Sequence, residues 1–232
     1  MKTCVTQPGK ACLLLAIAVA LWGAAACASR PGVAAGIPVR ETAILKRIAV
    51  LPFAEISPDE TSGRSGRCPV CGALFSAEAM PEGATGVVED AFVRRIGTGG
   101  KFDLVPSERT QAVYQRLEAA TLKQTPLQVL RAAGQDLAVE GIVAGYVYRF
   151  RERRGYPYAA ERPASVAFEV HLIRVSDGAS VWRGIYDHTQ ASLMENILHA
   201  ASFYREKGRW VSAAELTDEG MEGVLQTFPG LN

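Results

Sequence analysis

Two cysteines separated by two residues form the sharpest chemical signal in the sequence. Cys68 and Cys71 stand in the run Cys-Pro-Val-Cys-Gly, and Gly72 follows directly. A turn of this kind aims both sulfurs at one point, which is half of a tetrahedral zinc site. The same spacing also suits a local disulfide or, at the start of a helix, a thiol–disulfide redox pair. The sequence therefore offers three chemistries for this pair of cysteines.

The sequence contains no second Cys-x-x-Cys motif to complete a zinc site, and its other cysteines, Cys4, Cys12 and Cys27, lie in or directly after the leader. Among the histidines only His171, His188 and His199 are available, and none has the spacing of a zinc knuckle. A zinc ion shared between two chains is an alternative, since each chain supplies half a site. Residues 55–81 are rich in Ser, Gly, Pro and charge and predict a surface loop, which does not favour a redox pair. A disulfide that braces this loop is the preferred interpretation, with zinc binding as the alternative.

Sequence motifs of the common enzyme classes are missing. There is no nucleophile elbow, phosphate-binding loop or HExxH motif. The glycine-rich run 97–100 lacks a following Gly-Lys-Ser/Thr and is interpreted as the end of a helix. We therefore predict a protein that is not an enzyme.

Short apolar runs alternate with helical patterns along the chain. The predicted strands cover residues 47–53, 102–106, 137–150, 165–175 and 180–189, and the predicted helices cover 82–96, 108–120, 126–134, 193–204 and 212–227. The early crossovers require parallel pairing, whereas the Asp177-Gly178 turn predicts an antiparallel hairpin. The expected fold is α/β (α+β): a mixed sheet of about five strands packed by helices, in the order β-α-β-α-β-β-β followed by C-terminal helices. Alternation within 165–175 predicts one covered face of the sheet.

The first 26 residues have the order of a secretory signal peptide. Lys2 and Lys10 are followed by an apolar run over 11–22 and by the small residues 23–26. This run is too short to cross a bilayer, which takes about 20 apolar residues. Removing residues 1–26 takes away two lysines and leaves 23 basic residues against 24 acidic ones. The mature chain therefore lacks the basic excess of a nucleic-acid-binding protein.

Cys27, directly after the small residues, resembles the lipidated cysteine of bacterial lipoproteins. The resemblance implies that Cys27 becomes the first mature residue and carries palmitate and other acyl chains, with ordinary cleavage without lipidation as the alternative. The residues after Cys27 include no Asp in the second place, which by the sorting rule of that family favours the outer membrane of a Gram-negative cell, with the domain facing the periplasm. Residues 27–45 are then a flexible tether, and residues 46–232 form a single domain with the inserted loop 55–81.

Four motifs in order resemble the TolB amino-terminal-like proteins, a group that includes CsgG-like and LpoB-like envelope lipoproteins. They are the strand Arg47–Phe53, the segments Gly100–Val105 and Gly134–Tyr146, and the hairpin Val170–Trp182. The resemblance implies a non-catalytic domain that binds an envelope protein or assembles with copies of itself, as a scaffold or homo-oligomer. It does not imply a pore here, because residues 55–81 hold no pair of amphipathic membrane strands.

A stretch of arginines and aromatic residues supplies candidate partner contacts. Arginine and tyrosine are favoured in protein interfaces, and this stretch contributes Arg149, Arg151, Arg153, Tyr156 and Tyr158. A solvated hairpin tip is the alternative. The predicted function is a lipid-anchored protein-binding scaffold, and the alternative is a metal- or redox-active envelope protein that uses Cys68 and Cys71.

Overall fold

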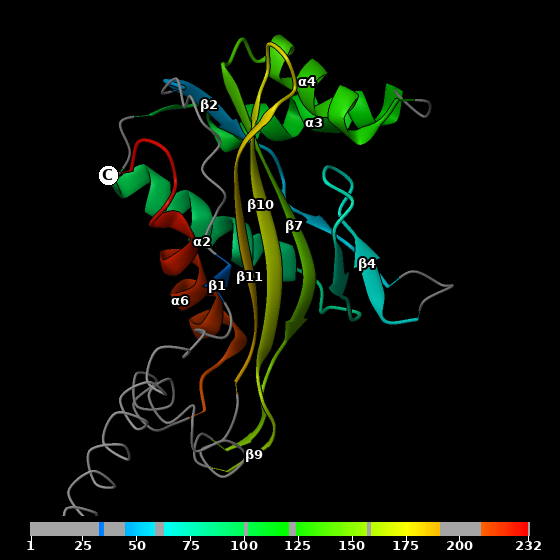
Figure 1. Cartoon of the computed structure of the whole chain (residues 1–232), viewed down its shortest axis with the longest axis vertical. Helices are drawn as coiled ribbons and strands as arrows, with labels where there is room; N and C mark the ends of the chain where they lie inside the picture. Colours follow the sequence, from blue (N-terminus) through cyan, green and yellow to red (C-terminus); the bar gives the residue numbers. More distant parts are fainter. Residues whose placement is uncertain are drawn as a thin grey trace, which may run out of the picture. The chain divides into compact units, whose positions relative to one another are not determined.

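Three long antiparallel strands form the centre of the sheet in the computed structural model of the chain (Figure 1). Strand β10 (Ser165–Arg174) pairs with β7 (Gly141–Arg151) on one side and with β11 (Ser180–Thr189) on the other. The turn between β10 and β11 is the predicted one: Gly178 has φ +76°, and the Asp177 carboxylate accepts a hydrogen bond from the Ala179 N–H at 3.0 Å. An aspartate before a left-handed glycine closes a tight turn of this kind.

The structure describes residues 33–34, 45–58, 63–99, 102–120, 124–156, 159–190 and 210–231. Several sequence predictions lie outside these residues, namely the signal peptide 1–26, Cys27, most of the tether, the helix 193–204, Tyr158 and His199.

The first half of the domain adds parallel strands to this centre. Strand β2 (Arg47–Val50) pairs in parallel with both β6 (Asp103–Leu104) and β7. Two strands of two residues complete the seven-stranded sheet: β3 (Ala54–Glu55) pairs with β7, and β1 (Val33–Ala34) pairs with β11. The predicted mixed sheet with its five main strands is confirmed. Strand β1 comes from the segment predicted to be a tether.

Helices cover both faces of the sheet. Helices α2 (Ala84–Gly99) and α6 (Ala213–Leu225) pack on one face, and α3 (Ser107–Ala120) and α4 (Pro126–Asp136) pack at one end of the opposite face (Figure 1). The predicted Thr125 cap of α4 is present, and its hydroxyl accepts a hydrogen bond from the Gln128 N–H. None of the helices within the described ranges is long and apolar enough to cross a membrane.

The segment predicted to be a surface loop instead forms a cover for the sheet. Strands β4 (Ser65–Arg67) and β5 (Leu74–Ser76) make a hairpin on the face opposite to α2 and α6 (Figure 1). Phe75 stacks on Tyr148 of β7 with ring centroids 4.4 Å apart, and Cys68 is 1% exposed. The difference from the prediction has a physical reason: the long strands extend past α3 and α4, and the hairpin buries apolar side chains that would otherwise face water.

A second hairpin forms a separate two-stranded sheet. It consists of β8 (Arg154–Tyr156) and β9 (Ala159–Arg162), which are antiparallel. Figure 1 shows this hairpin at the end of the long strands away from α3 and α4.

The contact between β11 and α6 leaves no room for a side chain at Gly184. A Cβ atom there would lie 2.2 Å from a methyl carbon of Val224 and 2.5 Å from the Trp182 ring. We expect Gly184→Ala to lower the free energy of unfolding by about 1–3 kcal/mol through overpacking. Gly97→Ala is the matched control, because no atom lies within 4 Å of its added Cβ and the residue lies in α2. Alanine at Gly97 should raise stability by about 0.5–1 kcal/mol. Urea unfolding measures both, and equal effects would contradict the packing.

Candidate metal centre

Four side chains with metal-binding atoms meet between the β4–β5 hairpin and the sheet. They are Cys68 and Cys71 from the hairpin, and Glu169 and His171 from β10. The ligand atoms of all four lie within 4.8 Å of one another. Cys68, Glu169 and His171 are buried, whereas Cys71 is exposed. Both cysteines are free thiols.

The turn of the hairpin places the two sulfurs on the same side. The Cys71 N–H points at the Cys68 sulfur at 3.4 Å, and the Gly72 N–H donates to the Cys68 carbonyl at 2.9 Å. Gly72 has φ +74°, a conformation that glycine adopts without steric cost. The Cys68 N–H donates to the Ala73 carbonyl at 2.8 Å and closes the turn. The turn therefore presents both sulfurs to the sheet, Cys68 beside His171 and Cys71 beside Glu169.

Strand geometry places the other two ligands opposite the hairpin. Glu169 and His171 are two residues apart, so both point to the same face of β10. The sequence prediction of a single covered face is wrong here, because both faces of β10 are covered and Glu169 and His171 are each 0% exposed. The signal that the sequence analysis missed is a glutamate and a histidine on one face of a strand that is otherwise apolar. His171 was a candidate ligand, but Glu169 was not.

The distances within the cluster fit a tetrahedral zinc ion. Zinc bonds of about 2.3 Å to sulfur and about 2.0 Å to nitrogen or oxygen put sulfur about 3.5 Å from either atom, and nitrogen about 3.3 Å from oxygen. The Cys68 sulfur lies 3.4 Å from His171 Nε2, and the Cys71 sulfur lies 3.3 Å from Glu169 Oε1. His171 Nε2 lies 3.1 Å from Glu169 Oε1. Each distance is within about 0.2 Å of the value for zinc ligands.

The pKa values of Cys68 and Glu169 are shifted in opposite directions. Burial raises the pKa of the Cys68 thiol to about 12, and the nearby Glu169 charge acts in the same direction. Burial by itself would also raise the pKa of Glu169. Hydrogen bonds and charge from His171 and a hydrogen bond from Arg183 outweigh burial and lower that pKa to about 2. Glu169 is therefore ionised and Cys68 is a thiol, and a metal ion that binds both must displace the thiol proton.

Neighbouring side chains hold the ligands in place. Tyr148 donates to Glu169 Oε2 at 2.9 Å, and Arg183 of β11 forms an ion pair with Glu169 Oε1. His171 Nδ1 lies 3.3 Å from the Ser180 hydroxyl, so Nε2 faces the cluster. Outer partners of this kind fix the orientation of metal ligands. With two thiolates and one carboxylate around a divalent ion, Arg183 also brings the local charge back to zero.

The donor set favours zinc over harder cations. Two cysteine sulfurs and one imidazole form a soft set that suits zinc, whereas Ca²⁺ and Mg²⁺ require oxygen ligands. Four protein ligands close a tetrahedral site and leave no position for a water or a substrate, which is typical of a structural zinc.

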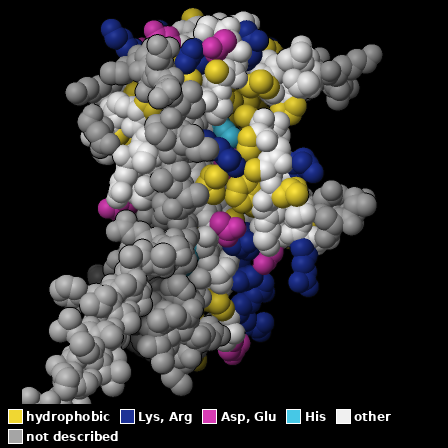
Figure 2. Space-filling view, viewed as in Figure 1, with side chains coloured by type: hydrophobic (Ala, Val, Ile, Leu, Met, Phe, Trp, Pro, Cys, Tyr) yellow, Lys and Arg dark blue, Asp and Glu magenta, His cyan; other side chains and the backbone are white. Residues whose placement is uncertain are grey.

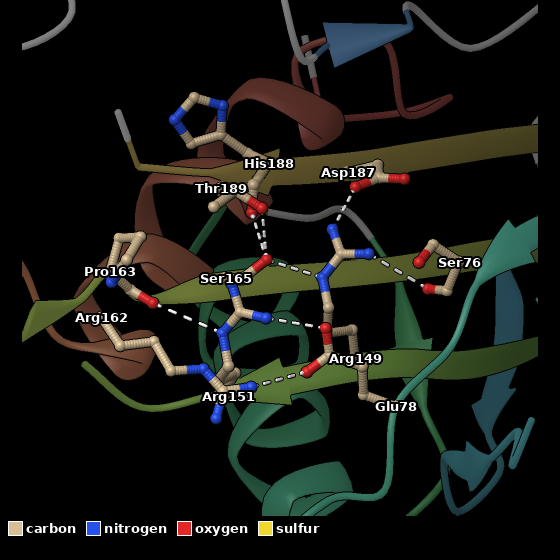
Figure 3. Close-up of polar contacts among 10 residues, drawn as sticks. All are labelled: Ser76, Glu78, Arg149, Arg151, Arg162, Pro163, Ser165, Asp187, His188 and Thr189. Carbon is tan, nitrogen blue, oxygen red and sulfur yellow. Dashed lines mark hydrogen bonds and ion pairs between the residues drawn. The ribbon is translucent and has the colours of Figure 1, made fainter. Parts of the chain in front are cut away.

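The arginines predicted to bind a partner lie in two different environments. Arg149 is 6% exposed; it donates to the Ser165 hydroxyl at 2.6 Å and the Ser76 carbonyl at 3.1 Å, and it forms an ion pair with Asp187 (Figure 3). Arg151 forms an ion pair with Glu78 at 2.7 Å. Both arginines therefore fasten residues 76–78, where the chain leaves β5, to the sheet, and we call these contacts the arginine clamp.

The other two predicted contacts that the structure describes lie at the β8–β9 hairpin. Arg153 directly precedes β8 and is only partly exposed, whereas Tyr156 at the end of β8 is 79% exposed. Leu74 of β5 is also exposed. Figure 2 shows hydrophobic side chains gathered beside the β4–β5 hairpin, with lysine or arginine side chains below them. His188 lies on β11 and is not part of the cysteine cluster.

Solved structures are similar to this chain in fold. A point variant of PelC from Paraburkholderia phytofirmans, a dodecamer, is 14% identical with a TM-score of 0.49, over 86% of this chain and 99% of that one. The lipoprotein GNA1162 from Neisseria meningitidis is 11% identical with a TM-score of 0.39, over 70% and 99%. The LpoB C-terminal domain from Escherichia coli is 10% identical with a TM-score of 0.40, over 66% and 90%. No protein-family model and no curated protein sequence matches the chain. LpoB belongs to the group of envelope lipoproteins that the four sequence motifs resemble.

The buried arginine should matter for stability far more than an exposed one. Arg149→Met removes the donors to Ser165 and Ser76 and leaves Asp187 without its partner, so we expect a loss of about 2 kcal/mol in the free energy of unfolding. The matched control is Arg154→Met, because Arg154 pairs with Glu161 at 3.6 Å with both side chains mostly in solvent. That change should cost less than about 0.5 kcal/mol. Chemical denaturation of the two variants tests the difference, and a small loss at Arg149 would contradict the assigned clamp.

Proposed function

We propose that this protein is a lipid-anchored, non-catalytic envelope scaffold whose partner-binding domain is held in shape by one zinc ion. The ligands are Cys68, Cys71, Glu169 and His171. The observation that supports the metal is the convergence of four donor atoms within 4.8 Å of one another, with three of the distances between them close to the edges of a zinc tetrahedron.

The zinc ion has a structural task in this proposal. Two ligands belong to the inserted hairpin and two belong to a central strand, so the ion joins segments about one hundred residues apart along the chain. A two-stranded hairpin is only marginally stable on its own in water. A zinc ion that binds only the folded arrangement adds its binding free energy to the stability of the hairpin.

The anchor and the scaffold role rest on the leader sequence and on the closed form of the metal site. The small residues before Cys27 support cleavage and acylation at that cysteine. A site closed by four protein ligands supports a structural rather than a catalytic use of the metal. The exposed Tyr156 and Leu74 are the candidate contact residues for a protein partner.

The first test is the metal content of the protein isolated from cells. We expect about one zinc per chain after reconstitution under reducing conditions, and Co²⁺ in its place should give the intense charge-transfer absorption of a tetrahedral thiolate site. Cys68→Ser and His171→Ala should each lose the metal, because each change leaves only three of the four ligands. His188→Ala is the matched control and should retain full zinc content, since His188 lies outside the cluster. A wild-type protein that takes up no zinc would refute the metal centre.

The zinc should also be counted per chain to separate the two arrangements of the site. A site within one chain gives one ion per chain, whereas a site shared between two cysteine pairs gives half an ion per chain. The half value would contradict the use of Glu169 and His171 as ligands.

A separate test addresses the membrane anchor. Cells that express the full chain should incorporate labelled palmitate into this protein, and Cys27→Ala should abolish the label and release the protein from the membrane fraction. Several acyl chains anchor firmly because each buried methylene contributes about 0.8 kcal/mol. Cys71→Ala is the control and should remain labelled. Labelling that persists in Cys27→Ala would rule out this anchor.

A further inference from the structure

The two thiols of the metal centre differ in their exposure to solvent. Cys68 is 1% exposed under the hairpin, whereas Cys71 is exposed at its turn. Their ligand atoms lie within 4.8 Å, and the Cys71 N–H already points at the Cys68 sulfur. One sulfur can therefore be reached by a reagent in solution, and the second stands behind it. This is the arrangement of an attacking and a resolving cysteine.

We propose that the zinc centre is opened and closed by thiol–disulfide exchange, with Cys71 as the cysteine that reacts first and Cys68 as the one that resolves the intermediate. This inference rests on the proposed zinc site and adds to it a means of regulation. The envelope is an oxidising compartment in which disulfide donors are present, so the pair would meet its co-reactant there.

The exchange balances with a small-molecule or protein disulfide as the oxidant. The Cys71 thiolate attacks one sulfur of the donor disulfide, which forms a mixed disulfide and releases one donor thiolate. The Cys68 thiolate then attacks the Cys71 sulfur, which forms the Cys68–Cys71 bond and releases the second donor thiolate. Two electrons pass from the protein sulfurs to the donor. The zinc ion loses two of its four ligands and leaves as Zn²⁺.

The sheet should stay folded when the metal leaves, because the buried Glu169 carboxylate keeps its partners. Glu169 retains the ion pair with Arg183 and the hydrogen bond from Tyr148, and His171 Nε2 lies 3.1 Å from the same carboxylate. A buried carboxylate that retains these partners does not force the strands apart. The opened state is therefore a second folded state of the domain and not an unfolded one.

The opened state should differ from the zinc-bound state only at the turn of the hairpin. The turn at residues 67–73 is attached to β10 through the sulfurs, and it loses that attachment. The exit of the hairpin stays attached, because Arg149 holds the Ser76 carbonyl and Arg151 holds Glu78. Neither contact involves sulfur or metal.

The test uses the zinc-loaded full chain, processed and isolated from cells, with oxidised glutathione as the probe. We expect release of one zinc per chain, two molecules of reduced glutathione per zinc, and an intramolecular disulfide seen by mass spectrometry. Amide hydrogen exchange should become faster in residues 67–73 and stay unchanged around Ser76 to Glu78. Dithiothreitol with zinc should restore both zinc content and protection.

A matched variant separates exchange from mere loss of metal. In Cys71→His an imidazole replaces the exposed thiol as a zinc ligand, so the variant should keep its zinc in the presence of oxidised glutathione. Should this variant bind no zinc, the reversal of the wild-type reaction by dithiothreitol still decides. Zinc that stays bound to the oxidised wild-type protein, a lasting glutathione adduct on Cys71, or unchanged exchange in residues 67–73 would each overturn the inference. These outcomes require a zinc-loaded protein, so they are distinct from a failure to bind zinc at all.

Discussion

The ionised carboxylate of Glu169, buried under the hairpin, is the constraint on which this half of the domain depends. A charge out of water costs several kcal/mol unless partners compensate it. Its partners come from separate elements: Arg183 from β11, Tyr148 from β7 and the Cys71 thiol from the hairpin. A shift in the register of either neighbouring strand would turn one partner to the wrong face. Compensation of one charge therefore ties the register of three strands to the position of the hairpin.

The β4–β5 hairpin covers one end of a sheet face whose other end is covered by helix α4. At that end α4 covers the sheet with apolar side chains such as Leu130, whose burial needs no polar partner. The hairpin is smaller, and its contribution to the core is mainly Cys68, Ala77 and the half-buried Phe75. So small an apolar area stabilises a cover only weakly. Polar contacts have to add the stability that apolar packing does not supply. The thiol cluster and the arginine clamp both occur along this one segment for that reason.

Local patterns predicted the framework of the fold but not the site. The apolar runs, the Thr125 cap and the Asp177-Gly178 turn depend on residues close in sequence, and the structure confirms all three. The cysteine turn was equally visible. The other two ligands of the site were not visible, because Cys68 and His171 are 103 residues apart. They meet because the hairpin packs on β7 and β7 pairs with β10. Alternation in β10 was interpreted as one buried and one solvated face, which hid Glu169 among polar residues expected to face water. The inserted hairpin reverses that interpretation, since it covers the second face.

The two attachments of the hairpin differ in the conditions that break them. The clamp consists of the guanidinium groups of Arg149 and Arg151, which depend on neither metal nor sulfur, and Arg149 has its donors shielded from solvent. The sulfur cluster depends on thiols, whose state follows metal supply and oxidant. In the proposed exchange, the hairpin keeps its attachment at residues 76–78 and loses the attachment at its turn. The exposed Leu74 lies between the two attachments, so the exchange would change the surface around Leu74 and leave the core on the other face of the sheet as it is.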